Sequence, residues 1–214
     1  MFGFTGCMPT PRGSYAKGLA KREEILTQAL ETIARSGFRG ASVKEIADAV
    51  GLSQAGLLHY FDSKEELFTE ILRKRDEIDS DGRPFDIDGE PEFDKLIEGY
   101  LQVVRHNSEV PGLVELFSQL AVDAADQAHP AHEFFRERGA HLRGMLARTM
   151  RSAQRTGRID PRLDPDTLAR TVQALTDGMQ LQWLADPEVD MTAPLVALFE
   201  VIGASAPARP EPEG

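Results

Sequence analysis

The sequence predicts an all-α fold, because apolar residues recur at intervals of three and four residues along most of the chain. Helix-starting Ser or Asp residues and helix-ending Gly or Pro residues separate these stretches, and no alternating strand pattern of useful length competes with them. The 214 residues, 41% of them hydrophobic and 28% charged, are enough to bury a globular core. We expect a small N-terminal helical domain followed by a larger one.

The N-terminal part carries signals for short helices joined by tight turns. Ser42, with Glu45 three residues later, forms a capping box, and Ser53 and Ser63 are further N-cap candidates. Gly51 ends the helix that Ser42 starts. The helices expected here cover residues 17–36, 42–50, 53–61 and 63–74.

An acidic stretch rich in Gly and Pro separates this part from the rest of the chain, and it is typical of a loop. Beyond it, prolines divide the helical patterns from one another. These patterns cover residues 92–107, 112–128, 131–156, 164–185 and 192–204. The expected organisation is a flexible leader (1–16), a helix-turn-helix domain (17–75), an acidic linker (76–91), a helical domain (92–205) and a disordered tail (206–214).

Basic residues gather near the N-terminus, although the whole chain is acidic. Residues 12–75 carry eleven Lys and Arg against nine Asp and Glu, whereas the net charge of the chain is −11. Arg12, Lys17, Lys21 and Arg22 precede the first acidic residue and form a basic lead-in. This end of the molecule can therefore face phosphate groups while the rest of the chain repels them.

The segment from Ser42 to Phe61 has the residue types of a helix-turn-helix. Two closely crossing helices need a small residue where they meet and a turn residue that tolerates positive φ, and Ala47 and Gly51 meet these needs. Leu57 then returns from the second helix to close the contact. Spacing, residue size and turn chemistry agree on the motif.

The residues around this motif carry a resemblance to a known family. The stretches ILTQALETIARSGF, SVKEIADAVGLS, QAGLLHYF and DSKEELF resemble the DNA-binding domain of the TetR family of transcriptional regulators. The resemblance covers Ile25–Leu72, about a quarter of the chain. It implies a one-component regulator with an N-terminal three-helix, helix-turn-helix DNA-binding domain and a larger helical domain for effector binding and dimerisation.

The resemblance also implies particular contacts to double-stranded DNA. Gln54, Ala55 and Gly56 open the recognition helix, whose side chains approach base edges, and the amide of Gln54 suits adenine. The other expected contacts hold the phosphate backbone. The full set is Ser42, Lys44, Ser53, Gln54, Ala55, Gly56, His59, Tyr60 and Lys64. A role in the core stays open for Tyr60 and His59, and a solvated charge for Lys64.

Two parts of the larger domain are expected to serve dimerisation and effector binding. Because one recognition helix contacts only a few base pairs, we expect a homodimer on a palindromic operator. The candidate interface on the last two helical patterns is Leu168, Val172, Leu175, Met179, Trp183, Leu195, Leu198, Phe199 and Ile202. The candidate contacts to a small-molecule effector are His106, Phe117, Leu120, Phe134, Phe135, His141 and Met145. Packing within the monomer stays the alternative for each of them.

Other classes of protein are disfavoured. A single cysteine, Cys7, permits neither an intramolecular disulfide nor a cysteine-based metal cluster, which suits a cytoplasmic protein. No stretch approaches the ~18 apolar residues of a membrane span. The chain has no catalytic motif and no cofactor-binding glycine loop, so we expect neither an enzyme nor a cofactor. Glu133, Glu137 and His141 share a helical face, but a solvated polar face is commoner than a metal site, and no metal is expected.

The leading hypothesis is a repressor that binds its operator as a dimer and is released by a small-molecule effector. A helical small-molecule-binding protein or enzyme, in which the helix-turn-helix is only structural, is the alternative, and the basic lead-in argues against it. Activation of transcription and a response to a protein partner also stay open.

Overall fold

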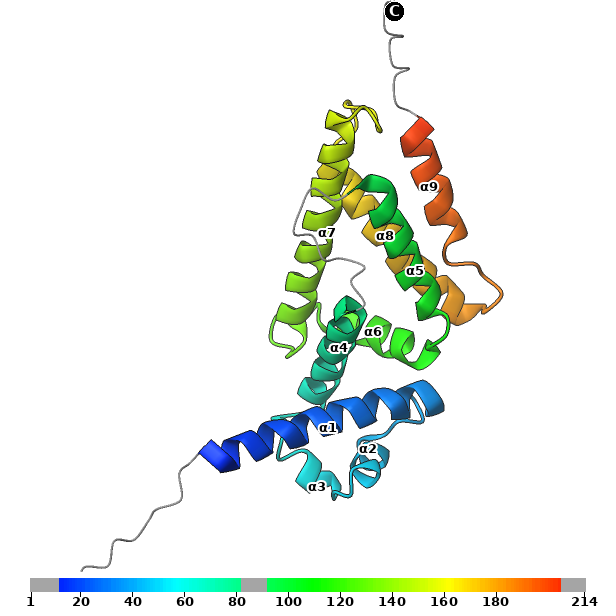
Figure 1. The fold of residues 1–214 in the computed structure, drawn as a ribbon. Helices are drawn as coiled ribbons and strands as arrows, with labels where there is room; N and C mark the ends of the chain where they lie inside the picture. The colour runs from blue at the N-terminus through cyan, green and yellow to red at the C-terminus, as the bar shows by residue number, and fades with distance from the viewer. Residues whose placement is uncertain (1–11, 82–91, 205–214) are drawn as a thin grey trace, which may run out of the picture.

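The computed structural model describes residues 12–81 and 92–204, and this part of the chain folds into α-helices without a strand (Figure 1). The helices are α1 (Arg12–Ser36), α2 (Val43–Ala49), α3 (Gln54–Leu57), α4 (Lys64–Asp81), α5 (Phe93–Asn107), α6 (Pro111–Asp123), α7 (His132–Arg155), α8 (Pro165–Ala185) and α9 (Ala193–Ala204). We call α1–α4 the head and α5–α9 the body. The predicted all-α fold is confirmed.

The head has its own hydrophobic core. Ile25 and Ile33 from α1, Ile46 from α2, Leu57 from α3 and Leu67 from α4 are fully buried in one cluster. α1 lies across the head above α2 and α3, and α4 leads from there to the body (Figure 1). Because α2 and α3 are too short to be stable alone, this burial is what holds them in place.

The first helix starts earlier than the sequence predicted. α1 begins at Arg12, whereas the apolar pattern is regular only from Lys17. The first turn carries too few apolar residues for hydrophobic spacing to detect it. The segment predicted as a flexible leader (1–16) is therefore helical from residue 12 onwards, and residues 1–11 lie outside the described part of the chain.

The fourth helix ends later than the sequence predicted. α4 continues to Asp81 instead of ending near Lys74. No Gly or Pro lies between these two residues, and acidic side chains are compatible with a solvated helix. The segment predicted as an acidic linker (76–91) therefore begins as helix. Its remainder, 82–91, and the predicted tail, 206–214, lie outside the described residues.

The body is built around α7 and α8, which pack against each other, with α5 running in about the same direction as α8 and α9 on the other side of the body from α7 (Figure 1). Its apolar core includes Met145 from α7, Val172 from α8 and Leu195 from α9. Inside this core the hydroxyl oxygens of Tyr100 and Thr176 lie 2.7 Å apart. Burial raises the pKa of Tyr100 to about 12, so this phenol is a neutral hydrogen-bonding group.

Head and body share a packed junction. A Cβ on Gly112, at the start of α6, would lie 2.6 Å from the carbonyl oxygen of Ile33 and 2.8 Å from the Cα of Gly37. The missing side chain thus lets α6 approach the end of α1. On the α7 side, Arg138 donates to the carboxylate of Asp76 on α4 at 2.8 Å. The body therefore holds the head through both α1 and α4.

Candidate nucleic-acid interface

The turn between α2 and α3 is built by local capping contacts. Ser42 Oγ accepts from the amide of Glu45 at 3.2 Å, and the Glu45 carboxylate accepts from the amide of Ser42 at 2.8 Å, which is the predicted capping box. Gly51 has a φ of 69°, the left-handed conformation that the turn requires. Ser53 Oγ accepts from the amide of Gly56 at 3.0 Å and starts α3. These caps set the direction in which α3 leaves the turn.

Buried residues then lock the two helices of the motif together. Ala47 on α2 and Leu57 on α3 are fully buried, and the Leu52 amide donates to the Ala47 carbonyl at 2.9 Å. α3 is a single turn that ends at Leu57, whereas the sequence predicted a helix to about Phe61. Phe61 itself is buried in the core of the head. The short α3 therefore depends on its neighbours for its orientation.

None of the predicted DNA contacts is buried. Those exposed are Ser42, Lys44, Ser53, Gln54, Ala55, His59 and Lys64, and those half-buried are Gly56 and Tyr60. Among the described residues, the side chains of Lys44, Gln54 and His59 have no hydrogen-bond partner. Lys64 Nζ lies 5.5 Å from the ring centroid of Phe68 and faces no acid in the described chain. The motif thus presents unoccupied polar groups from α2, α3 and the start of α4.

Two residues of the basic lead-in have partners inside the head. Lys21 Nζ donates to the carbonyl oxygen of Val50 at 3.0 Å, and Arg22 Nη1 donates to the carbonyl oxygen of Tyr60 at 2.6 Å. Lys17, by contrast, is exposed and pairs with no described residue. The expectation that the lead-in faces phosphate needs correction at Lys21 and Arg22, because their donors are occupied by the head itself.

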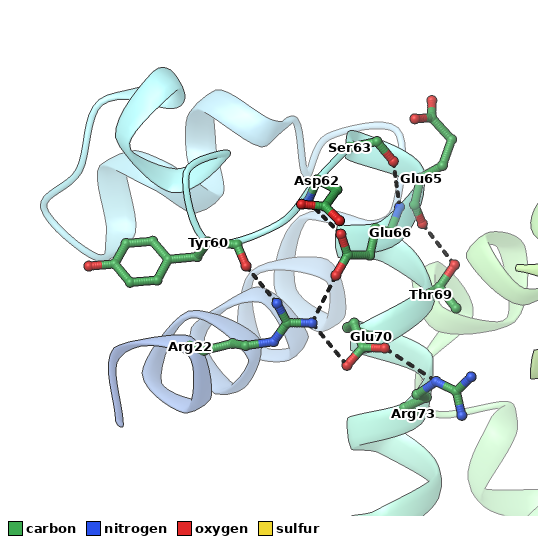
Figure 2. Close-up of polar contacts among 9 residues, drawn as sticks. All are labelled: Arg22, Tyr60, Asp62, Ser63, Glu65, Glu66, Thr69, Glu70 and Arg73. Atoms are coloured by element: carbon green, nitrogen blue, oxygen red, sulfur yellow. Dashed lines mark hydrogen bonds and ion pairs between the residues drawn. The ribbon is translucent and has the colours of Figure 1, made fainter. Parts of the chain in front are cut away.

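Arg22 also pairs with α4 (Figure 2). Its Nη2 lies 3.0 Å from Glu66 Oε1 and 3.3 Å from Glu70 Oε2, and its guanidinium carbon lies 4.3 Å from the ring centroid of Phe61. Burial alone would lower the pKa of Arg22, but the hydrogen bonds that it donates to Glu66 and Glu70 raise it. We call Arg22, Tyr60, Glu66 and Glu70 the Arg22 cluster. The phenol ring of Tyr60 points away from this cluster (Figure 2).

Both parts of the chain match known families. Residues 25–71 match the model for bacterial regulatory proteins of the tetR family, and residues 113–200 match the C-terminal region of BetI-type transcriptional repressors. Together the two matches span more than half of the chain. The chain belongs to the TetR family. Members of this family are transcriptional regulators and not enzymes, and they bind DNA and small-molecule effectors.

Individual relatives agree with this assignment. The HTH-type transcriptional repressor KstR2 of Rhodococcus jostii is 28% identical over 134 residues, which are 63% of this chain and 57% of that protein. The HTH-type transcriptional regulator RutR of Escherichia coli K12 is 44% identical over 55 residues, 26% of either protein. Less than two thirds of each of these relatives is therefore matched. A crystal structure of a TetR-family regulator from Rhodococcus sp. superposes with a TM-score of 0.63 at 24% identity, covers 87% of this chain and 98% of its own, and shares the fold.

The TetR body does not bring the predicted effector contacts into one site. At the junction of α6 and α7 with the head lie Phe117, Leu120, Phe134 and Phe135. The rings of Phe117 and Phe135 are 5.0 Å apart, so these residues fill the junction core. Met145 is buried in the core of the body, whereas His106 and His141 are exposed. The residues that were predicted to line one pocket therefore lie in two different cores and on the surface.

Sequence reasoning missed polar residues inside the TetR body. Thr176 and Gln180 lie one turn apart on the buried face of α8, and the Gln180 side chain has no hydrogen-bond partner among the described residues. Next to Thr176, the half-buried Asp177 has a raised pKa because of burial, although Arg138 and Gln173 oppose the shift. A polar residue at the spacing of an apolar helical face was the signal that could have revealed this group.

The predicted dimer contacts lie on the expected helices, but most of them point into the monomer. Those buried within the single chain are Val172, Met179, Trp183, Leu195, Phe199 and Ile202. Those half-buried are Leu168, Leu175 and Leu198. On the same helices Leu181 is 57% exposed and Val201 is 65% exposed. The apolar surface of α8 and α9 is therefore carried by Leu181 and Val201 together with the half-buried Leu168, Leu175 and Leu198.

Two further features lie outside the motif. A cavity of about 360 Å³ lies between α1 and α4, and it is lined by charged residues that pair with one another, such as Lys74 with Glu23 at 2.7 Å. Among the described residues, no group of three or more His, Cys, Asp or Glu side chains is placed to hold a metal ion. Nor does any described helix have the length and apolar character to cross a membrane.

Proposed function

We propose that this TetR-family chain is a one-component repressor, which acts in the cytoplasm as a homodimer on a two-fold symmetric operator and is released by a small-molecule effector. The observation that carries the proposal is the set of unoccupied polar side chains around the helix-turn-helix. Lys44 on α2, Gln54 at the start of α3 and Lys64 at the start of α4 are all exposed. Polar groups that the head does not use internally are available to DNA.

These side chains divide between base reading and backbone contact. Gln54 is the first residue of α3, and its amide donates and accepts together, as the edge of adenine requires. Lys44 and the Tyr60 hydroxyl lie on either side of it in the chain and suit phosphate oxygens. Lys64 adds its charge to the positive end of α4. Gln54 therefore specifies the sequence, while the others hold the duplex.

Dimerisation through α8 and α9 places two such heads on one operator. Leu181 and Val201 are large apolar side chains left exposed on these helices, with the half-buried Leu198 near Val201 in the chain. Burial of such apolar surface against a partner is favourable by roughly 25 cal/mol for each Å² that is removed from water. A second copy of the chain is the natural partner, because a symmetric dimer matches the symmetry of a palindromic site.

The effector site that we propose lies between α5 and α8, at Tyr100, Thr176 and Gln180, instead of at the junction residues. An effector that takes over the hydrogen bond between Tyr100 and Thr176 changes the spacing of these two helices. The end of α5 also holds α4, because Arg75 donates to the side chain of Asn107. A shift of α5 thereby reaches α4 and the head, and the effector favours the arrangement with lower DNA affinity.

A binding-site selection from random double-stranded DNA tests the proposed reading residues. Wild-type protein should select two inverted half-sites, and Gln54→Ala should relax the preference at one position of each half-site. Lys64→Met should instead weaken every sequence alike and lower the salt dependence of binding by about one phosphate contact per head. The assignment of Gln54 is wrong if its substitution changes neither affinity nor base preference.

A reporter gene placed behind the selected operator tests the sign of regulation and the effector. Repression by the wild-type protein, relieved by one member of a small-molecule panel, supports the proposal. The relieving compound should lose its effect with Thr176→Val, which keeps the volume near Tyr100 but removes the hydroxyl. Stimulation of the reporter would instead identify an activator.

A further inference from the structure

We propose that Arg22 is a positioning residue for DNA binding, which holds the Tyr60 end of the recognition segment between α1 and α4. This inference rests on the proposed function, in which the Tyr60 hydroxyl contacts phosphate. Sequence position alone would make Arg22 a phosphate contact of its own, as part of the basic lead-in. The Arg22 cluster gives it a different task, because its guanidinium is turned toward the protein (Figure 2).

The recognition segment needs such support because it is short. α3 ends at Leu57, and the chain then runs through turns from residue 58 to Ser63 before α4 begins. A helix of one turn has little stability by itself. The carbonyl oxygen of Tyr60 finds its partner in Arg22 Nη1 at 2.6 Å. An α1 side chain thus fixes the point where the segment turns back toward α4.

Neighbouring residues are held by the same cluster. The guanidinium of Arg22 lies over the ring of Phe61, with 4.3 Å between its carbon and the ring centroid. The Glu66 carboxylate, which pairs with Arg22 at 3.0 Å, also accepts from the amide of Asp62. Three consecutive residues, Tyr60 to Asp62, are therefore tied directly or through Glu66 to one guanidinium.

Only arginine has the geometry for this set of contacts. The guanidinium is planar, and its separate nitrogens donate in different directions while its face stacks on an aromatic ring. Nη1 donates to the carbonyl oxygen of Tyr60, and Nη2 pairs with the carboxylates of Glu66 and Glu70. A lysine ammonium keeps the positive charge but cannot form the same fork or stack. The charge-conserving change Arg22→Lys therefore separates a positioning role from a simple phosphate contact.

A double-mutant cycle on DNA affinity tests the proposal. The probe is the duplex operator selected by the wild-type protein, and the variants are Tyr60→Phe and Arg22→Lys, alone and combined. Tyr60→Phe should weaken binding about tenfold in the wild-type background, as expected for loss of a hydrogen bond to a charged group. In the Arg22→Lys background the same change should weaken DNA binding by less than about twofold, because the hydroxyl is no longer held against its phosphate.

Lys44→Met is the matched control, because Lys44 lies on α2, outside the Arg22 cluster. It should weaken binding by the same factor in both backgrounds. Equal effects of Tyr60→Phe in both backgrounds, or no loss of affinity with Arg22→Lys, would overturn the positioning role. So would a Tyr60→Phe variant that binds like the wild type, whereas the proposed interface as a whole fails only if Lys44→Met and Gln54→Ala are silent too.

Thermal unfolding of each variant shows whether the head stays folded at the temperature of the binding assay. If Arg22→Lys does not, Glu70→Gln takes its place in the cycle. This change removes the negative charge 3.3 Å from Nη2, which helps to hold the guanidinium against the carbonyl oxygen of Tyr60. A reduced effect of Tyr60→Phe in that background supports the positioning role, and an unchanged effect overturns it.

Discussion

The ammonium group of Lys21 donates to the carbonyl oxygen of Val50 at 3.0 Å, so a residue of α1 closes the C-terminal end of α2. The C-terminal end of a helix leaves carbonyl groups unpaired and carries a partial negative charge, and a nearby cation compensates for both. Arg22, the next residue, likewise donates to the carbonyl oxygen of Tyr60, which lies after α3. Adjacent cations on α1 therefore hold the C-terminal end of α2 and the turn that follows α3.

Removing the Lys21 contact should lower the stability of the head. We expect Lys21→Met to cost about 1 kcal/mol, because the exchange leaves the Val50 carbonyl without its charged donor. That is a fall of roughly 2–4 °C in the melting temperature of a chain of this size. Lys17→Met, on the same helix but without a described partner, is the control and should melt like the wild type. Equal melting of the two variants would contradict the role of Lys21.

A side chain at Gly112 should loosen the junction between head and body. In Gly112→Ala the new Cβ meets the backbone of Ile33 and Gly37, which cannot turn aside as a side chain can. Such overpacking costs about 1–3 kcal/mol, measurable by urea unfolding. Gly144→Ala is the control, because its Cβ meets only Arg148 Nη1 at 3.5 Å in the middle of α7. That variant should gain about 0.5–1 kcal/mol from the better helix former.

A charge on the exposed face of α8 should break the proposed dimer without unfolding the monomer. Leu181→Glu places a carboxylate where an apolar contact is expected, and sedimentation should show a chain of half the wild-type mass with an unchanged circular dichroism spectrum. Val122→Glu on α6, at a position 72% exposed, is the control and should leave the assembly intact. A dimeric Leu181→Glu variant would place the interface elsewhere.

The carboxyl of Asp177 should make the stability of the body depend on pH. Burial raises its pKa above the ordinary 3.8, so its charged form is disfavoured in the folded chain. The folded state is therefore penalised at neutral pH, and this penalty disappears as the pH falls through the raised pKa to below the ordinary value. Asp177→Asn should melt higher than the wild type at pH 7, and the difference should vanish near pH 3. A variant that melts lower at pH 7 would contradict this reading.

Much of the head could be predicted because its signals are local. The capping box of Ser42 and Glu45 and the turn at Gly51 depend on residues within one helical turn, and the structure confirms them. The partners of Lys21 and Arg22, by contrast, lie 29 and 38 residues away in the chain. Whether a cation is free for DNA or used by the protein depends on such distant groups, and sequence spacing does not report them.

The body shows the same division more strongly. Apolar periodicity identified the helices and their buried faces, including Trp183 on α8 and Phe134 on α7. It could not say what covers each face: Trp183 packs into the core of the body, and Phe134 belongs to the core of the head. Burial is a property of the assembled surface, so a periodic pattern predicts that a face is covered but not by which element.

The sequence by itself therefore determined the helices, the turn chemistry of the motif and the family. These depend on residue types at short, regular intervals, where backbone geometry leaves few alternatives. Only the tertiary structure decided that Arg22 faces the protein while Lys44 and Gln54 stay free. It also decided that α6 and α7 close the core of the head, because side chains far apart in sequence compete for the same partners only once the helices are packed.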